Sequence, residues 1–198
     1  MGMGAATNAF NALRTAMESY APISDETWAG LVALCRFREL QKHQVLYPLG
    51  EIPASFAFVF RGLFRSFITD EKGNEYNKNF FYENTFPGSM VALLRHQPSQ
   101  FAIVALEPAQ IIELDFPAYR SLLLQRDDLK LFQIHYLEKN WLLDKDAREI
   151  AIVQEDATQR YLRFIQDYPF LVERLPQHHI ASHLGITPTQ LSRIRKKL

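Results

Sequence analysis

The spacing of hydrophobic residues divides the chain into helical and extended regions. Residues 8–20 place apolar side chains three and four positions apart, which predicts a helix with one buried side. A second helix is expected to begin at Ser24, because a serine followed by two acidic residues is a favourable helix start. From about residue 37 to residue 115 the apolar runs are short and are separated by turn residues, which favours strands. Helical spacing then returns after Pro117.

The extended region predicts a compact antiparallel structure. A loop at 87–94 is expected to run into one short helix. Seven or so short strands in about eighty residues indicate a small β-barrel or jelly roll. We therefore predict an α+β fold, with an N-terminal antiparallel β-roll flanked by helices. The expected strands are 37–40, 44–47, 56–60, 63–69, 75–82, 100–106 and 110–115.

A small helix at 117–125 and a long helix at 128–154 should follow the roll. Six of eight positions along one side of the long helix are apolar, which suits a coiled-coil-like dimer seam. The alternative, that this side packs only on the roll of its own chain, stays open. The seam runs through Leu129, Phe132, Tyr136, Lys139, Leu143, Asp146, Ile150 and Val153, and the predicted dimer contacts are Phe132, Tyr136, Leu143 and Ile150.

The last twenty-two residues, 177–198, have the spacing of two short helices that cross at a tight turn. Ala181 is small where the helices approach, and Gly185 allows the left-handed backbone that ends the first helix. Thr187 then provides a hydroxyl cap, and Pro188 occupies the first helical position, where its missing N–H costs nothing. A helix at 157–167 and a linker reaching Pro176 should precede this helix-turn-helix pattern. The alternative is a helical hairpin that only caps a core.

Charge separates the C-terminal segment from the rest of the chain. The whole chain is neutral, whereas residues 157–198 hold seven Arg or Lys against two acidic residues. This basic end favours double-stranded DNA as a partner. We expect Arg193, Gln190 and Thr189 to read bases. The candidate DNA contacts are Gln177, Thr187, Thr189, Gln190, Ser192, Arg193 and Lys196.

Catalytic and metal sites have little support. Cys35 is the single cysteine, and the roll offers only His43 and His96, without the close spacing of a metal-binding cupin. His179 and His183 are four residues apart on the first helix of the pair, where a position near phosphate explains them more simply than a metal. No Gly-rich nucleotide loop is present. We therefore expect no catalytic residue, metal or cofactor.

The sequence also lacks a long apolar run and a basic-then-apolar signal peptide at its start. A cytoplasmic protein without a membrane partner is the resulting expectation.

The order of roll, long helix and helix-turn-helix resembles the cyclic-AMP receptor protein/FNR (Crp/Fnr) family of bacterial transcription regulators. The resemblance rests on YPLGE (47–51), FVFRGLFR (58–65), DEKGNEY (70–76), NTFPGSM (84–90), DATQRYLRF (156–164) and the C-terminal pair. The short, aromatic-rich form is similar to a branch common in Bacteroidetes-type bacteria. The resemblance implies a cyclic-nucleotide-binding-like sensor domain (1–127), a dimerisation helix (128–155) and a helix-turn-helix DNA-binding domain (156–198). It further implies a homodimer on a pseudo-palindromic site.

Two departures from the family pattern affect the nucleotide site. Ser89 stands where cyclic-nucleotide-binding members have a glutamate for the ribose, and Ser99 or Gln100 stands where they have an arginine for the phosphate. We therefore expect a degenerate site that does not bind cyclic AMP. The remaining possibilities are an unknown small-molecule effector in a more apolar cavity near Phe80, Tyr82, Phe86, Leu93 and Phe101, a cyclic-nucleotide-responsive regulator, or a ligand-free protein-interaction module with constitutive DNA binding. The candidate ligand residues are Phe86, Gly88, Ser89, Met90, Ser99 and Gln100.

Overall fold

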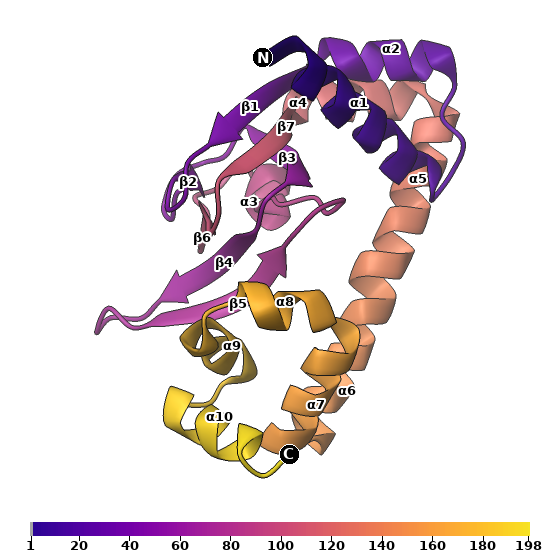
Figure 1. Ribbon diagram of the computed structural model, residues 1–198. Coiled ribbons are helices and arrows are strands. Elements are labelled where there is room, and N and C mark those ends of the chain that lie inside the picture. Colours follow the sequence, from indigo (N-terminus) through magenta and orange to yellow (C-terminus); the bar gives the residue numbers. More distant parts are fainter. Residues whose placement is uncertain (1) are drawn as a thin grey trace.

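The computed structural model describes residues 2–198, apart from the side chains of residues 2, 3, 144, 147, 148 and 152. Two helices open the chain, α1 (Gly2–Glu18) and α2 (Asp25–Ala33). The Ser24 side chain accepts a hydrogen bond from the backbone of Thr27, which confirms the predicted start of α2. Both helices lie across one end of the roll, next to α4 (Phe116–Gln125) (Figure 1).

The predicted antiparallel roll is confirmed, and each predicted run overlaps a strand. One sheet has the order β1-β7-β3 and the other β2-β6-β4-β5 within the described residues. The loop before β6 contains the expected short helix, α3 (Met90–Arg95). The strands are β1 (Cys35–Leu40), β2 (Val45–Tyr47), β3 (Ser55–Arg61), β4 (Phe64–Thr69), β5 (Glu75–Phe81), β6 (Ala102–Ala105) and β7 (Ala109–Asp115).

Alternation along β3 and β7 divides the core of the roll into two layers. Phe58 pairs with Ile112, and both side chains pack toward α1, α4 and the long helix. Their neighbours Val59 and Ile111, which also pair, point the other way into the space between the sheets. A period of two along each strand thus buries both faces of this sheet.

The long helix continues away from the roll as three consecutive segments (Figure 1). These are α5 (Asp127–Leu137), a π-helical turn η1 (Glu138–Leu143) and α6 (Asp144–Gln154). Phe132 is 4% exposed and packs with Tyr136, Tyr20 and Phe86 of its own chain. The first half of the predicted seam is therefore part of the core of its own chain. In the second half, Leu143 is 65% and Ile150 49% exposed.

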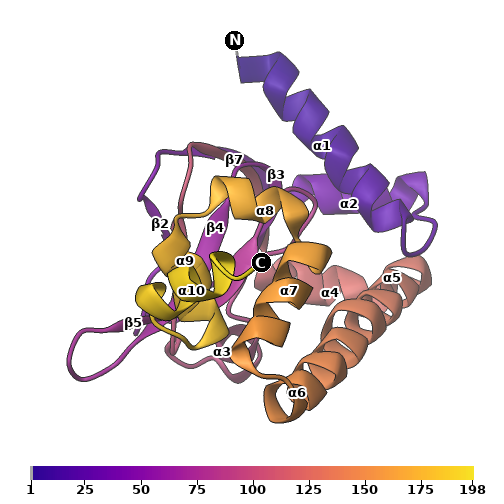
Figure 2. The same cartoon turned by 60° about the horizontal axis from the view of Figure 1, so that its bottom comes forward.

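The C-terminal segment folds into a cluster of helices beside the roll and the end of α6 (Figure 2). α7 (Ala157–Asp167) begins at Asp156, which forms a capping box with Gln159. The linker predicted at 168–176 is wrong in part, because α8 (Pro169–Arg174) occupies most of it. Pro169 fits the first helical position, and burial of Leu171 stabilises the turn. The helix pair α9 (Gln177–Leu184) and α10 (Pro188–Arg195) ends the chain.

Candidate nucleic-acid interface

The turn between α9 and α10 has the geometry that its sequence predicts. Gly185 has a φ of 69°, in the left-handed region, and the N–H of Ile186 donates to the carbonyl of Ala181 at 3.0 Å. Ala181 and Leu191 are fully buried where the two helices meet. The small side chain at 181 therefore allows the two helices to pack closely, and the glycine at 185 allows the short turn that connects them.

A reciprocal cap fixes the start of α10. The Thr187 hydroxyl accepts from the backbone N–H of Gln190 at 3.2 Å, while Oε1 of Gln190 accepts from the backbone N–H of Thr187 at 2.9 Å. Such a capping box satisfies two N–H groups that a helix start leaves open. The two predicted DNA contacts Thr187 and Gln190 thus also hold the helix start, and the carbonyl oxygen of the Gln190 side chain is already engaged.

The structure gathers most of the predicted DNA contacts along α10. Thr189, Arg193 and Lys196 follow at intervals of four and three residues, so they lie on one exposed side of the helix. Thr187 and Gln190 are exposed at its start, and Ser192 is partly buried. Gln177 lies apart from them, partly buried at the first turn of α9.

The helix cluster is joined to the roll by a shared core and an ion-pair network. Leu63, Phe80 and Leu106 of the roll pack in the same apolar cluster as residues of α7 to α10. Beside them, the Arg174 guanidinium binds Glu83 at 2.8 Å and Glu107 at 2.7 Å. Burial alone raises the pKa of Glu83, but hydrogen bonds from Arg174 and from the Gly62 backbone outweigh it and hold that pKa below its ordinary value.

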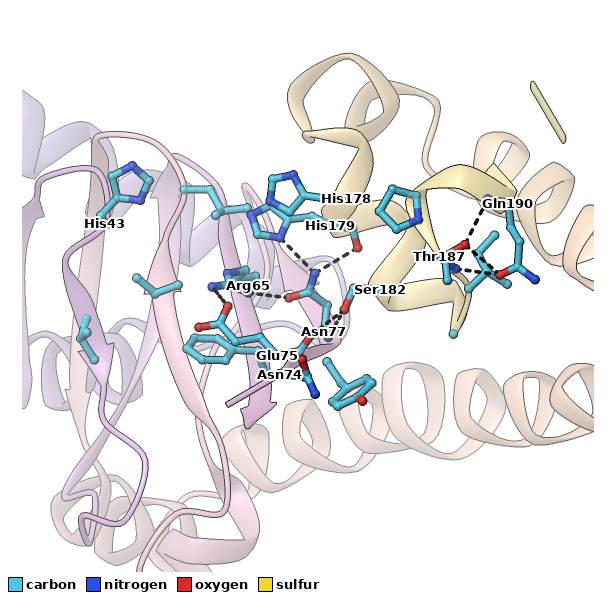
Figure 3. Close-up of a pocket in the computed structure, with 18 residues that line it drawn as sticks. His43, Arg65, Asn74, Glu75, Asn77, His178, His179, Ser182, Thr187 and Gln190 are labelled. Carbon is cyan, nitrogen blue, oxygen red and sulfur yellow. Dashed lines mark hydrogen bonds and ion pairs between the residues drawn. The ribbon is translucent and has the colours of Figure 1, made fainter. Parts of the chain in front are cut away.

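A cleft of about 1010 Å³ lies between α9, the start of α10 and strands of the roll. Asn77 of β5 contacts His179 and Ser182 of α9 at this cleft (Figure 3). Sequence reasoning missed Asn77 and Arg174, because their partners lie 67 to 105 positions away along the chain.

The predicted nucleotide site is filled by the protein's own side chains. Ser89 and Ser99 are 2% and 3% exposed, and the Ser99 hydroxyl donates toward that of Ser89 at 2.9 Å. A Cβ at Gly88 would lie 2.8 Å from the Cβ of Phe56, so the glycine allows the loop to pack closely on β3. Phe86 packs its ring on Phe58 at 5.2 Å. The structure brings Ser89 and Ser99 into contact with each other.

The other candidate ligand residues do not converge on one cavity. Met90 packs against the helix-side core, and Gln100 is exposed. The suggested apolar cavity is wrong, because its five residues belong to three separate clusters. Phe86 and Leu93 pack with the helices, Phe80 and Tyr82 with the C-terminal cluster, and Phe101 with the core between the sheets.

Within the described residues, no group of three or more His, Cys, Asp or Glu is placed to hold a metal ion. Burial raises the pKa of the Cys35 thiol to about 12, so this cysteine remains a thiol at neutral pH. No helix in residues 2–198 is long and apolar enough to cross a bilayer.

Comparison with known proteins finds a family that the roll resembles. Residues 37–126 match the family model of the cyclic nucleotide-binding domain. The roll is therefore similar to a cyclic nucleotide-binding domain. No curated protein sequence shows significant similarity to the chain.

Solved structures extend the similarity beyond this domain. The c-di-GMP-responsive global regulator CLP of Xanthomonas campestris has a TM-score of 0.69 at 16% identity, over 88% of this chain and 91% of that one. FixK2 of Bradyrhizobium japonicum has a TM-score of 0.69 at 14% identity, over 83% and 84%. The catabolite activator protein of Thermus thermophilus has 0.54 at 20% identity, over 89% and 84%. At these identities the likeness shows a shared fold alone.

Proposed function

We propose that this chain is a dimeric, DNA-binding transcription regulator of the Crp/Fnr type and not an enzyme. The helix pair α9–α10 carries the proposal. It combines a left-handed glycine turn, a capped second helix and an exposed side with Thr189, Arg193 and Lys196. In a helix-turn-helix the second helix enters the major groove, and these side-chain types contact base edges and phosphates there. The basic balance of residues 157–198 supports the same role.

The three parts of the chain take different tasks in this proposal. Residues 1–127 form the sensor, 128–155 the dimerisation helix and 156–198 the DNA-binding domain. An exposed apolar side of η1 and α6 supports dimerisation, because a second copy of the helix would cover it. Two copies then present two recognition helices to half-sites about one DNA turn apart. The exposed apolar residues of the long helix include Leu131, Ile134, Trp141, Leu142, Leu143, Ile150 and Val153.

The sensor is proposed to be a degenerate cyclic-nucleotide-binding domain that does not take cyclic AMP. Ser89 supplies no carboxylate for a ribose, and Ser99 supplies no positive charge for a phosphate. Their mutual hydrogen bond supports this proposal, because each hydroxyl already has a partner inside the folded roll. Such a regulator acts in the cytoplasm, where it meets DNA. Its short, aromatic-rich sequence supports the Bacteroidetes-type branch.

Selection of DNA from a random pool by the purified full chain tests the proposed function. We expect the bound sequences to converge on a pseudo-palindrome, with half-site centres separated by about ten base pairs. Light scattering on the selected duplex should give two chains per site. A pool that shows no enrichment at low salt, or one chain per duplex at micromolar protein, contradicts the proposal.

A further inference from the structure

The α9 helix docks on the open edge of a sheet. β5 is the outer strand of the sheet β2-β6-β4-β5, so its backbone groups need partners other than a strand. The Ser182 hydroxyl provides them: it accepts from the N–H of Asn77 at 2.9 Å and donates to the carbonyl of Glu75 at 3.1 Å. One side chain of α9 therefore bridges two backbone groups of this edge.

The side chain of Asn77 makes a second link, and its orientation is fixed by its partners. The Arg65 guanidinium donates to Oδ1 of Asn77 at 3.0 Å, and a guanidinium can only donate. Nδ2 of Asn77 must then face α9, where it donates to the carbonyl of His179 at 3.0 Å. Asn77 is 5% exposed, so both ends of its amide are satisfied inside the interface between roll and helix.

This orientation also fixes the protonation of His179. Nδ2 of Asn77 lies 3.2 Å from Nδ1 of His179. Since Nδ2 carries only hydrogens to donate, Nδ1 has to accept, and the ring is neutral with its proton on Nε2. If the imidazole were protonated, its Nδ1–H would point at the N–H of Asn77 Nδ2, and two donors would face each other. The observed contact therefore exists only with a neutral His179.

The charges around His179 oppose its protonation as well. Its pKa is lowered to about 4 from an ordinary value of 6.5, chiefly by burial and next by the positive charge of Arg65 of β4, with smaller contributions from His178 of α9 and His43 of the β1–β2 loop. Glu75 of β5 acts in the opposite direction, but it is paired with Arg65. Figure 3 shows Asn77 between the Arg65 side chain and α9.

We propose that Asn77, His179 and Ser182 form a proton-released latch, which holds α9 on the roll while His179 is neutral and loosens when it is protonated. Because the pKa is lower in the docked state, docking is strongest above pH 6.5 and weakens as the pH falls toward 4. Between pH 8 and pH 5 the ratio of docked to undocked molecules should fall about 30-fold. The consequence for DNA rests on the proposed function. Thr187 and Gln190 at the start of α10 line the same cleft, so acidification should change how freely α10 moves relative to the roll.

Amide hydrogen exchange in the full chain, without DNA, tests the latch. The Asn77 N–H donates to Ser182 of α9, so its protection factor reports how often α9 leaves the sheet edge. The N–H of Val59, which donates to Thr85 within the roll, serves as the internal reference. We expect the Asn77 protection factor to fall about 30-fold from pH 8 to pH 5, after correction for intrinsic exchange, while that of Val59 changes much less.

Two variants separate the latch from general acid sensitivity. His179→Gln cannot gain a charge, so the Asn77 protection factor should become independent of pH. His178→Gln removes the exposed neighbouring ring and should retain most of the pH response. The proposal is overturned by an Asn77 protection factor that stays constant in the wild type, by a fall of equal size at Val59, or by a response that persists in His179→Gln. A protein that shows the latch but binds no DNA would contradict the proposed function alone.

Discussion

In the proposed function, the hydroxyl pair Ser89–Ser99 determines which ligands the roll can bind. A carboxylate and a guanidinium at these positions would bind a ribose and a cyclic phosphate through charge-assisted hydrogen bonds, which are stronger than neutral ones. Two buried hydroxyls that bind each other leave no charged group in their place. A cyclic nucleotide would have to break this contact and bury its phosphate without a cationic side chain from either position.

Cyclic AMP and cyclic GMP should therefore bind poorly. Losing one charge-assisted contact costs about 1.5–3 kcal/mol, so losing both weakens binding by roughly a hundredfold or more. Isothermal titration calorimetry of the full chain with each nucleotide should show no binding at low micromolar concentration. A dissociation constant in that range for either nucleotide would mean that other groups of the roll recognise the phosphate.

The elements themselves were largely predictable, because local physics fixes them. Short apolar runs define β3 and β7, and hydroxyl or carboxylate caps define the starts of α2, α7 and α10. The predictions that were wrong concern segments whose structure depends on tertiary packing. The segment at 168–176 has a proline near each end and so resembles a linker, yet burial of Leu171 makes most of it a helix. Likewise, a three–four spacing cannot distinguish the seam of a dimer from Phe132 packing on its own roll.

The exposed half of the long helix, η1 and α6, is expected to form the dimer interface. Leu143→Glu with Ile150→Glu places two charges on the apolar side of η1 and α6. Dimerisation would then have to bury both carboxylates, which carries a large desolvation cost. We expect this double variant to be monomeric by light scattering at micromolar concentration, while the wild type is a dimer. Val91 is an exposed apolar residue on α3, so Val91→Glu is the matched control and should stay dimeric. A double variant that remains a dimer places the interface elsewhere.

The docking of α9 and α10 on the roll is a property of the whole molecule. It depends on Arg174, Asn77 and Phe80, whose partners are far away in the sequence. No local pattern indicates which of the many charged and aromatic residues meet across such an interface. The sequence therefore predicted the candidate DNA-reading residues, which share one short helix, and missed the contacts that position this helix.

Arg174→Met tests the ion-pair network between the roll and the helix cluster. The variant leaves the carboxylates of Glu83 and Glu107 without their guanidinium, and it should lower the free energy of unfolding by about 1–2 kcal/mol, since all three groups keep some contact with water. The pKa of Glu83 lies below its ordinary 4.5 in the folded protein, so its contribution is complete above pH 4.5 and is lost as the pH falls further.

Urea denaturation at several pH values measures this effect. The difference in unfolding free energy between wild type and Arg174→Met should be constant near neutrality and shrink below pH 4.5. Arg36→Met, which removes an exposed guanidinium from Glu113, is the control and should have a smaller effect. A difference that grows on acidification would show that Arg174 does not act through these carboxylates.

If α10 reads DNA, Arg193→Ala should lower the affinity for the selected duplex more than the affinity for random DNA. Fluorescence anisotropy at one fixed salt concentration compares wild type and variant on the selected duplex and on a random duplex. We expect a loss of about 1–3 kcal/mol on the selected duplex and a much smaller loss on random DNA. Lys196→Ala, as the control, should weaken both duplexes alike and flatten the salt dependence. An equal loss on both duplexes in Arg193→Ala would contradict the claim.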